Sequence, residues 1–285
     1  MRHRLFSVVV GAAALMLLPV FADLSFGQRG GRGNNNAPAK PTPRWPDGTV
    51  NWGANIGETG LWNVQGGVFA DPDPVPGAAP EGNRFPGKPT VSQVPFQPWA
   101  RAIYDYRQHN QLEPYTRCKP SGAFRQVATA YGTQFVNFPE LKQFIIFQTG
   151  GSHSYRTIYM DGRGHPKDLA PSYYGHSIGH FEGDTLVVDT VGYNERMWVS
   201  NLEGMPHSDR LHTIERFTRT DYNTMTYELT IDDPGAYTTT WKTGWFIRFN
   251  AGVESFEFIC QDNNKADEMM VGTMGEVDRS SPFVP

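Results

Sequence analysis

From Phe135 onward, the sequence is a succession of short segments rich in β-branched and aromatic residues, with no helical pattern between them. Most are bounded by Gly, Asp, Asn or Pro, and the segment 224–231 alternates so that Tyr227, Leu229 and Ile231 share one face. Close spacing without crossover helices favours antiparallel pairing. The predicted strands are 144–149, 155–160, 185–191, 213–219, 224–231, 239–249 and 255–261.

We therefore expect a mainly β fold, an antiparallel meander that closes into a lipocalin-like barrel, with a β-sandwich as the alternative. Closure removes the free sheet edges on which other chains could pair. The sequence shows no internal repeat of fixed period, which disfavours a propeller. The barrel domain is expected over 135–270, with a C-terminal tail over 271–285.

The N-terminus predicts export. Residues 1–27 have the pattern of a secretory signal peptide, because Arg2, His3 and Arg4 precede the apolar run 5–21. The alternative is a single membrane anchor, but the run is near the lower limit for spanning a bilayer. Residues 28–48 are rich in Gly, Asn and Pro and predict a flexible linker. We expect a periplasmic or secreted protein without a membrane span after cleavage.

Between the linker and the strands, residues 49–134 predict an irregular, Gly- and Pro-rich segment that wraps over the barrel. A helix is expected over 98–111, because Pro98 permits a helix start and Pro114 stops it. Aromatic side chains are expected to fix the rest of this segment by packing on the barrel. They are Trp52, Trp62, Phe69, Phe85, Phe96 and Trp99.

Charge and cysteine content limit the classes of partner and the cellular compartment that we expect. The chain has 25 Lys and Arg against 29 Asp and Glu, and no long basic run, so nucleic acid is not expected as a partner. A protein partner is not indicated. Cys118 and Cys260 are the two cysteines. Oxidising conditions outside the cytoplasm predict a disulfide, and two buried free thiols are the alternative.

The stretch 153–190 holds four of the eight histidines, and its polar side chains are too varied for a plain core or surface. His176 and His180 have the spacing of a helical zinc pair, but Gly175 and Gly179 disfavour a helix there. In an extended chain the two side chains would lie about 13 Å apart, too far for one ion. We therefore predict no metal, and the sequence does not indicate a cofactor.

Other residues in this stretch have structural alternatives. Ser177 could act as a nucleophile, but its flank lacks the second half of a G-x-S-x-G elbow. Asp161 and Arg163 flank Gly162, so an ion-paired turn explains them as well as a function does. Glu215 and Arg216 could similarly be explained as a cross-strand pair.

The functional interpretation rests on the number of such residues in two neighbouring strand–loop–strand segments. Loops at one end of a barrel converge on its mouth, where ligand sites form. We expect one concavity there, with an irregular entry near Ser154 that brings His153 and Arg156 together. Histidines beside carboxylates suit proton transfer, and arginines suit oxyanions. The candidate catalytic residues are His153, Asp161, His176, His212 and Glu215. The candidate ligand-binding residues are Arg156, Tyr159, Arg163, His165, Tyr174 and Ser177.

The sequence also resembles a large, uncharacterised family of exported bacterial proteins. The resemblance covers roughly residues 95–270, and its most specific part is 175–190, GHSIGHFEGDTLVVDT. It extends to 153–165, to 211–217, to Asp232, Asp233 and Pro234, and to the pairing of Cys118 with Cys260. Relatives often have Trp where this chain has Phe181. The resemblance implies export and a β-rich domain, but no reaction.

Three functions follow as hypotheses. The first is an exported barrel that binds a small, partly apolar molecule such as a sugar, polyphenol or terpenoid in a pocket lined by His, Arg, Asp and aromatic side chains. The second is a hydrolase, lyase or isomerase that uses a histidine and a carboxylate as acid and base, with Arg stabilising an oxyanion. The third is a structural surface protein.

Overall fold

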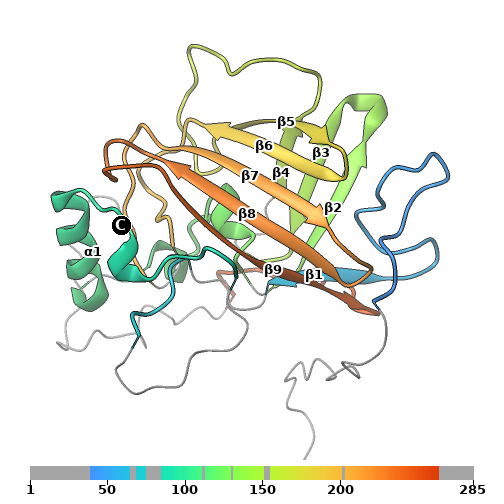
Figure 1. Ribbon diagram of the computed structural model, residues 1–285, viewed down its shortest axis with the longest axis horizontal. Helices are drawn as coiled ribbons and strands as arrows, with labels where there is room; N and C mark the ends of the chain where they lie inside the picture. Colours follow the sequence, from blue (N-terminus) through green and yellow to red (C-terminus); the bar gives the residue numbers. More distant parts are fainter. Residues whose placement is uncertain are drawn as a thin grey trace, which may run out of the picture. The chain divides into compact units, whose positions relative to one another are not determined.

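Nine strands form a closed barrel (Figure 1), as the alternating sequence predicted. The computed structural model describes residues 39–64, 69–74, 85–110, 113–129, 131–150, 155–200 and 203–262. The expected signal peptide, most of the linker, the tail and His153 lie outside these residues. The strands are β1 Gly60–Val64, β2 Thr133–Phe138, β3 Gln143–Gln148, β4 Tyr155–Tyr159, β5 His176–Glu182, β6 Thr185–Val191, β7 His212–Arg219, β8 Thr224–Asp232 and β9 Trp241–Ala251.

The strands follow one another around the barrel, and β9 pairs with β1 to close it. All pairs are antiparallel except β4 with β5, which are parallel over Ile158 opposite Ser177 and Tyr159 opposite Ile178. The expectation of a purely antiparallel meander is therefore wrong at one place. The long connection between β4 and β5 crosses back so that β5 starts beside the end of β4.

Alternation along each strand separates an apolar inner face from a mixed outer face. On β7 and β8, Phe217 lies opposite Tyr227 and their ring centroids are 4.8 Å apart. Tyr227 in turn packs on Trp245 of β9, with centroids 4.6 Å apart. These side chains are buried, and the barrel interior is a packed core of aromatic and aliphatic groups.

The segment before the predicted barrel contributes to it directly. Residues 60–64 form β1, so the expectation that 49–98 wraps the barrel without regular structure is wrong there. The aromatic packing was predicted correctly for Phe69 and Phe85, whose ring centroids lie 5.2 and 5.3 Å from those of Trp245 and Phe246, but Trp99 is 45% exposed. Gly60 permits this entry, because a Cβ there would lie 2.1 Å from the Phe249 ring.

Helices are few among the described residues. α1 spans Pro98–Asn110, close to the predicted helix, and α2 is a single turn over Ala123–Gln126. The short 3₁₀ helices are η1 Val91–Gln93, η2 Pro114–Arg117 and η3 Pro139–Leu141. No helix in these ranges is long and apolar enough to cross a membrane.

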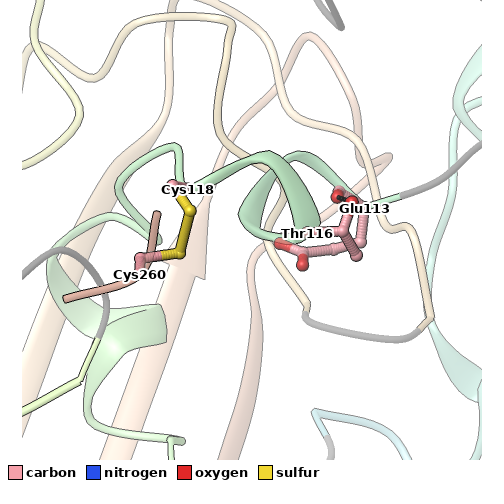
Figure 2. The surroundings of a disulfide bond; sticks show 4 residues. All are labelled: Glu113, Thr116, Cys118 and Cys260. Atoms are coloured by element: carbon pink, nitrogen blue, oxygen red, sulfur yellow. Dashed lines mark hydrogen bonds between the residues drawn. A yellow bond between two sulfur atoms is a disulfide. The ribbon is translucent and has the colours of Figure 1, made fainter. Parts of the chain in front are cut away.

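A disulfide joins Cys118 to Cys260, as predicted from the two cysteines (Figure 2). Cys118 follows η2 with φ at 58°, and Thr116 in the same turn donates to the Glu113 carbonyl at 2.6 Å. The bond ties the chain after β9 to the segment before β2. The strand predicted over 255–261 does not form, and this segment runs from β9 to the disulfide without strand pairing.

Candidate functional site

The connection between β4 and β5 carries the first part of the candidate site (Figure 1). It begins with the ion-paired turn that was the structural alternative for Asp161 and Arg163: Arg163 Nε lies 2.9 Å from both carboxylate oxygens. The Arg163 guanidinium also lies 4.2 Å from the centre of the Tyr159 ring. The connection ends at Gly175, where φ is 62° and a Cβ would lie 2.5 Å from the Val191 carbonyl oxygen. Glycine is therefore required where the chain enters β5.

Three histidines and one carboxylate meet on the outer face of β5, β6 and β7. Asp189 Oδ1 accepts from His212 Nε2 at 2.7 Å and from His165 Nε2 at 3.1 Å. His165 Nδ1 lies 2.8 Å from His176 Nδ1. The His176 ring stacks on Tyr159, with centroids 5.2 Å apart and planes 21° apart. We call His165, His176, Asp189 and His212 the outer-face network.

The strand register explains why these side chains meet. Asp189 on β6 lies opposite Ile178 on β5 and Ile214 on β7. His176 and His212 each precede one of these partners by two residues, so both point to the same face as Asp189. Diagonal neighbours on a sheet are within reach of long side chains. The β4–β5 connection then adds His165 from outside the sheet.

The network pushes two histidine pKa values in opposite directions. The hydrogen bond to Asp189 raises the pKa of His212. Burial, together with His165 and Arg163 nearby, lowers the pKa of His176. Burial alone would raise the pKa of Asp189, but the hydrogen bonds from His212 and His165 outweigh it, and its pKa is lowered. Near neutral pH the outer-face network therefore holds a carboxylate, a neutral His176 and a His212 with increased proton affinity.

A second polar group lies inside the barrel, behind the same strands. Arg156 Nη2 lies 2.5 Å from Glu215 Oε2, and both side chains are fully buried, with 1% and 0% of their surface exposed. Arg156 also donates from Nε to Ser177 Oγ at 3.0 Å and from Nη2 to Thr190 Oγ1 at 2.7 Å. Tyr227 donates to Glu215 Oε1 at 2.9 Å. We call Arg156, Ser177, Thr190, Glu215 and Tyr227 the inner-face network.

Some buried polar atoms in the barrel interior lack a hydrogen-bond partner among the described residues. Arg156 Nη1 and Trp245 Nε1 have no hydrogen-bond partner among the described residues. Glu215 Oε2 contacts Arg156 as an ion pair without hydrogen-bond geometry. Burial and the neighbouring Glu215 raise the pKa of Tyr227 well above its ordinary value, which keeps the phenol protonated as a donor. Ser177 is held by Arg156 and Thr190 inside the barrel, which supports its structural role rather than a nucleophilic one.

The expectation of a single concavity is wrong, because the sheet separates the predicted residues. His176, His212, His165, Tyr159, Arg163 and Asp161 lie outside, and Arg156, Ser177 and Glu215 lie inside. Tyr174 is partly buried and packs against the core. The cause is the alternation of side chains along each strand. Arg156 and Glu215 point inward while their sequence neighbours point outward, so residues that were predicted to share one barrel mouth lie on two faces of the sheet.

Sequence reasoning did not select Asp189, which joins the outer histidines. Its signal was present, since alternation places it on the face opposite Leu186, Val188 and Thr190. Within the part of the chain that the structure describes, no group of three or more His, Cys, Asp or Glu side chains is arranged to hold a metal ion.

A pocket of about 390 Å³ lies at the opposite end of β5 and β6, beside their turn. Trp52 and Phe181 form its aromatic wall, with ring centroids 6.1 Å apart and planes 29° apart. The other lining residues are Asp47, Gly48, Thr49, Val50, Asn137, Gly183 and Asp184. Sequence reasoning placed Phe181 and Asp184 in a specific motif but did not predict this pocket.

Comparison of the chain with protein-family models, with curated proteins and with solved structures found no match.

Proposed function

We propose that the protein binds a small, partly apolar ring molecule in the pocket beside the β5–β6 turn. The observation that carries this proposal is the pocket itself, whose volume of about 390 Å³ falls in the range of small-molecule sites. Its aromatic wall can pack against the ring of a ligand. Trp52 is 4% exposed and fixed from behind by Phe144, whereas Phe181 is 42% exposed and presents a free face.

Few polar groups line the pocket, and most are already engaged. Asp47 accepts from the backbone and hydroxyl of Thr49 at 2.9 and 2.7 Å. Asp184 accepts from Arg44 Nη1 at 3.0 Å. The Asn137 side chain makes no hydrogen bond to a described residue, so its amide can both donate and accept. This combination suits an uncharged ring with one or two hydroxyl groups at its edge, such as a phenol or a sugar.

An exposed ion pair borders the pocket through Asp184, which lines it. Arg44 joins the segment 44–50 to the β5–β6 turn through Asp184, and their side chains are 44% and 46% exposed. Exposed pairs of this kind contribute little to stability. The pair can therefore open to admit a ligand at low cost.

We also propose that the chain is exported. The Cys118–Cys260 disulfide supports this, because stable disulfides are typical of oxidising compartments. The basic residues and apolar run at the start of the sequence support it independently.

Titration calorimetry with phenol, 4-methylphenol and methyl glucoside tests the binding proposal. We expect one saturable site for at least one ring class and a roughly tenfold weaker affinity in Phe181→Ala, equivalent to about 1.4 kcal/mol of lost stacking and apolar contact. Phe147→Ala is the matched control, since Phe147 is 40% exposed on another strand and does not line the pocket. Equal loss in both variants, or no binding of any probe, would contradict the proposal.

A further inference from the structure

The outer-face network fixes where its protons lie. An ionised carboxylate only accepts hydrogen bonds, so the Nε2 atoms of His165 and His212 must both carry protons toward Asp189 Oδ1. The contact between His165 Nδ1 and His176 Nδ1 holds one proton, since one atom must donate and the other accept. When His165 is neutral, its proton is on Nε2, and its Nδ1 is the acceptor.

This assignment determines the state of His176. Its Nδ1 donates to His165, so its Nε2 carries a lone pair and no proton. No described residue forms a hydrogen bond with His176 Nε2. The Tyr159 ring stacks on His176 and holds its orientation. A neutral imidazole with one fixed nitrogen and one unengaged nitrogen is the arrangement of a general base.

We propose that the outer-face network is a proton relay in which His176 Nε2 acts as general base on a small, uncharged molecule with an acidic C–H or O–H bond. This site is separate from the pocket beside the β5–β6 turn, and it does not depend on ligand binding there. His176 is the residue that contacts the substrate. His165 and Asp189 are positioning residues that receive the charge.

The relay conserves protons and electrons. The substrate X–H bond breaks, its electron pair stays on X, and the proton bonds to His176 Nε2. The Nδ1 proton of His176 moves to His165 Nδ1 over the 2.8 Å contact. The positive charge then lies on His165, which donates from Nε2 to the Asp189 carboxylate. Return of the proton to X through the same path resets the network. If X instead takes a proton from solvent, the network resets when His176 Nε2 releases its extra proton to solvent, as in an isomerisation or exchange reaction.

The charges around His176 favour a neutral substrate that becomes an anion. Burial, the neighbouring His165 and, to a smaller extent, the Arg163 guanidinium above Tyr159 lower the pKa of His176, which keeps the base unprotonated near neutral pH. Asp161 binds Arg163 and offsets part of its charge. Asp232 on β8, which acts on His212, and Tyr159 on β4, which stacks on His176, are further titratable groups beside the network.

The same strand supplies a matched comparison. His180, four residues after His176 on β5, lies 3.2 Å from Glu182 Oε1, but its side chain is 64% exposed, and no histidine among the described residues forms a hydrogen bond with it. It has a carboxylate but no relay. His180→Gln therefore controls for loss of any outer-face histidine.

Nitrogen-15 NMR of the histidine rings in the full chain tests the proton assignment. At pH 7.5 we expect His176 as the Nδ1–H tautomer and His165 as the Nε2–H tautomer. His165→Leu removes the acceptor, and His176 should then revert toward the Nε2–H form that predominates in free histidine. A His176 that carries its proton on Nε2 in the parent chain would overturn the relay.

Base activity is tested with 5-nitrobenzisoxazole, a neutral aromatic carbon acid that opens when a base removes its ring proton. His176→Gln should lower the protein-dependent rate about 100-fold, the lower end of what a positioned base contributes. His165→Leu and Asp189→Asn should cause partial losses and change the pH profile, and His180→Gln should leave the rate unchanged. A parent rate no higher than that of His176→Gln would show that His176 is not a base.

Discussion

Strands β5, β6 and β7 carry one polar network on each face, built from residues adjacent in sequence. Ser177 and Thr190 point inward and hold Arg156, whereas their neighbours His176 and Asp189 point outward. The inner ion pair is fully buried, and the side chains of the outer pair, His212 and Asp189, are 34% and 38% exposed. The inner-face network therefore stabilises the fold, whereas the outer-face network leaves polar atoms accessible for chemistry.

The largest expected effect comes from breaking the inner network. Arg156→Met leaves Glu215 as an uncompensated charge in the core, which should lower the free energy of unfolding by about 3–5 kcal/mol. Chemical denaturation followed by tryptophan fluorescence measures it. The double variant Arg156→Met, Glu215→Leu should recover most of the loss, because neither charge of this buried pair is left without its partner. A loss below about 1 kcal/mol in the single variant would mean that the interior is open to solvent.

Removing the disulfide should lower the stability of the whole fold without changing the outer-face network. Cys118 and Cys260 are 142 residues apart, and removing the bond by Cys118→Ala with Cys260→Ala should cost about 2–5 kcal/mol. The pKa of His212, measured by NMR, should stay unchanged because the bond lies outside the outer-face network. A shifted His212 titration would indicate that the two regions are coupled. Thiol labelling of untreated protein should find no free cysteine.

The outer-face network should contribute a small, pH-dependent stability. The pKa of His212 is raised in the folded chain, so its contribution is complete below the unfolded value of about 6.5 and is lost as pH rises through the folded value. The difference in unfolding free energy between the parent and Asp189→Asn should shrink from pH 6 to pH 8.5. Because both groups are about one-third exposed, it should stay below about 1 kcal/mol. A difference that grows with pH would contradict the hydrogen-bond assignment.

The smallest loss of stability is expected for an arginine that is adjacent in sequence to the inner-face network but does not belong to it. Arg216 follows Glu215 on β7 but points outward, where it lies 2.7 Å from Glu182. Arg216→Ala should cost no more than about 0.5 kcal/mol, because exposed ion pairs are weak. Denaturation of Arg216→Ala beside Arg156→Met compares two arginine substitutions on opposite faces of one sheet. Similar losses would show that the faces do not differ as described.

Local patterns predicted most of the barrel. The segment 185–191 was predicted with the bounds of β6, and five other strands were predicted within two residues at either end. In these segments β-branched and aromatic residues alternate with polar ones, which is the signal of a half-buried strand. The helix from Pro98 was predicted because proline marks its start.

Long-range pairing could not be predicted in the same way. β1 lies in a Gly- and Pro-rich segment and becomes a strand only because β9 and β2 pair with it. β5 contains Gly179, which weakens its local strand signal but fits closely, since a Cβ there would lie 2.7 Å from Ile158. The fold-back of the β4–β5 connection brings His165 to Asp189, and no local pattern specifies that contact. Residue types therefore indicated the candidate site, and the chain path decided how its members were grouped.

The most direct test of the two-face account is the unfolding free energy of one triple variant, His176→Gln with Asp189→Asn and His212→Gln. It removes most of the outer-face network and leaves every inner-face residue in place. We expect a folded barrel that is at most about 2 kcal/mol less stable than the parent at pH 7, because these contacts are partly exposed. A loss as large as that of Arg156→Met, or failure to fold, would show that the outer histidines hold the barrel together and are not free for chemistry.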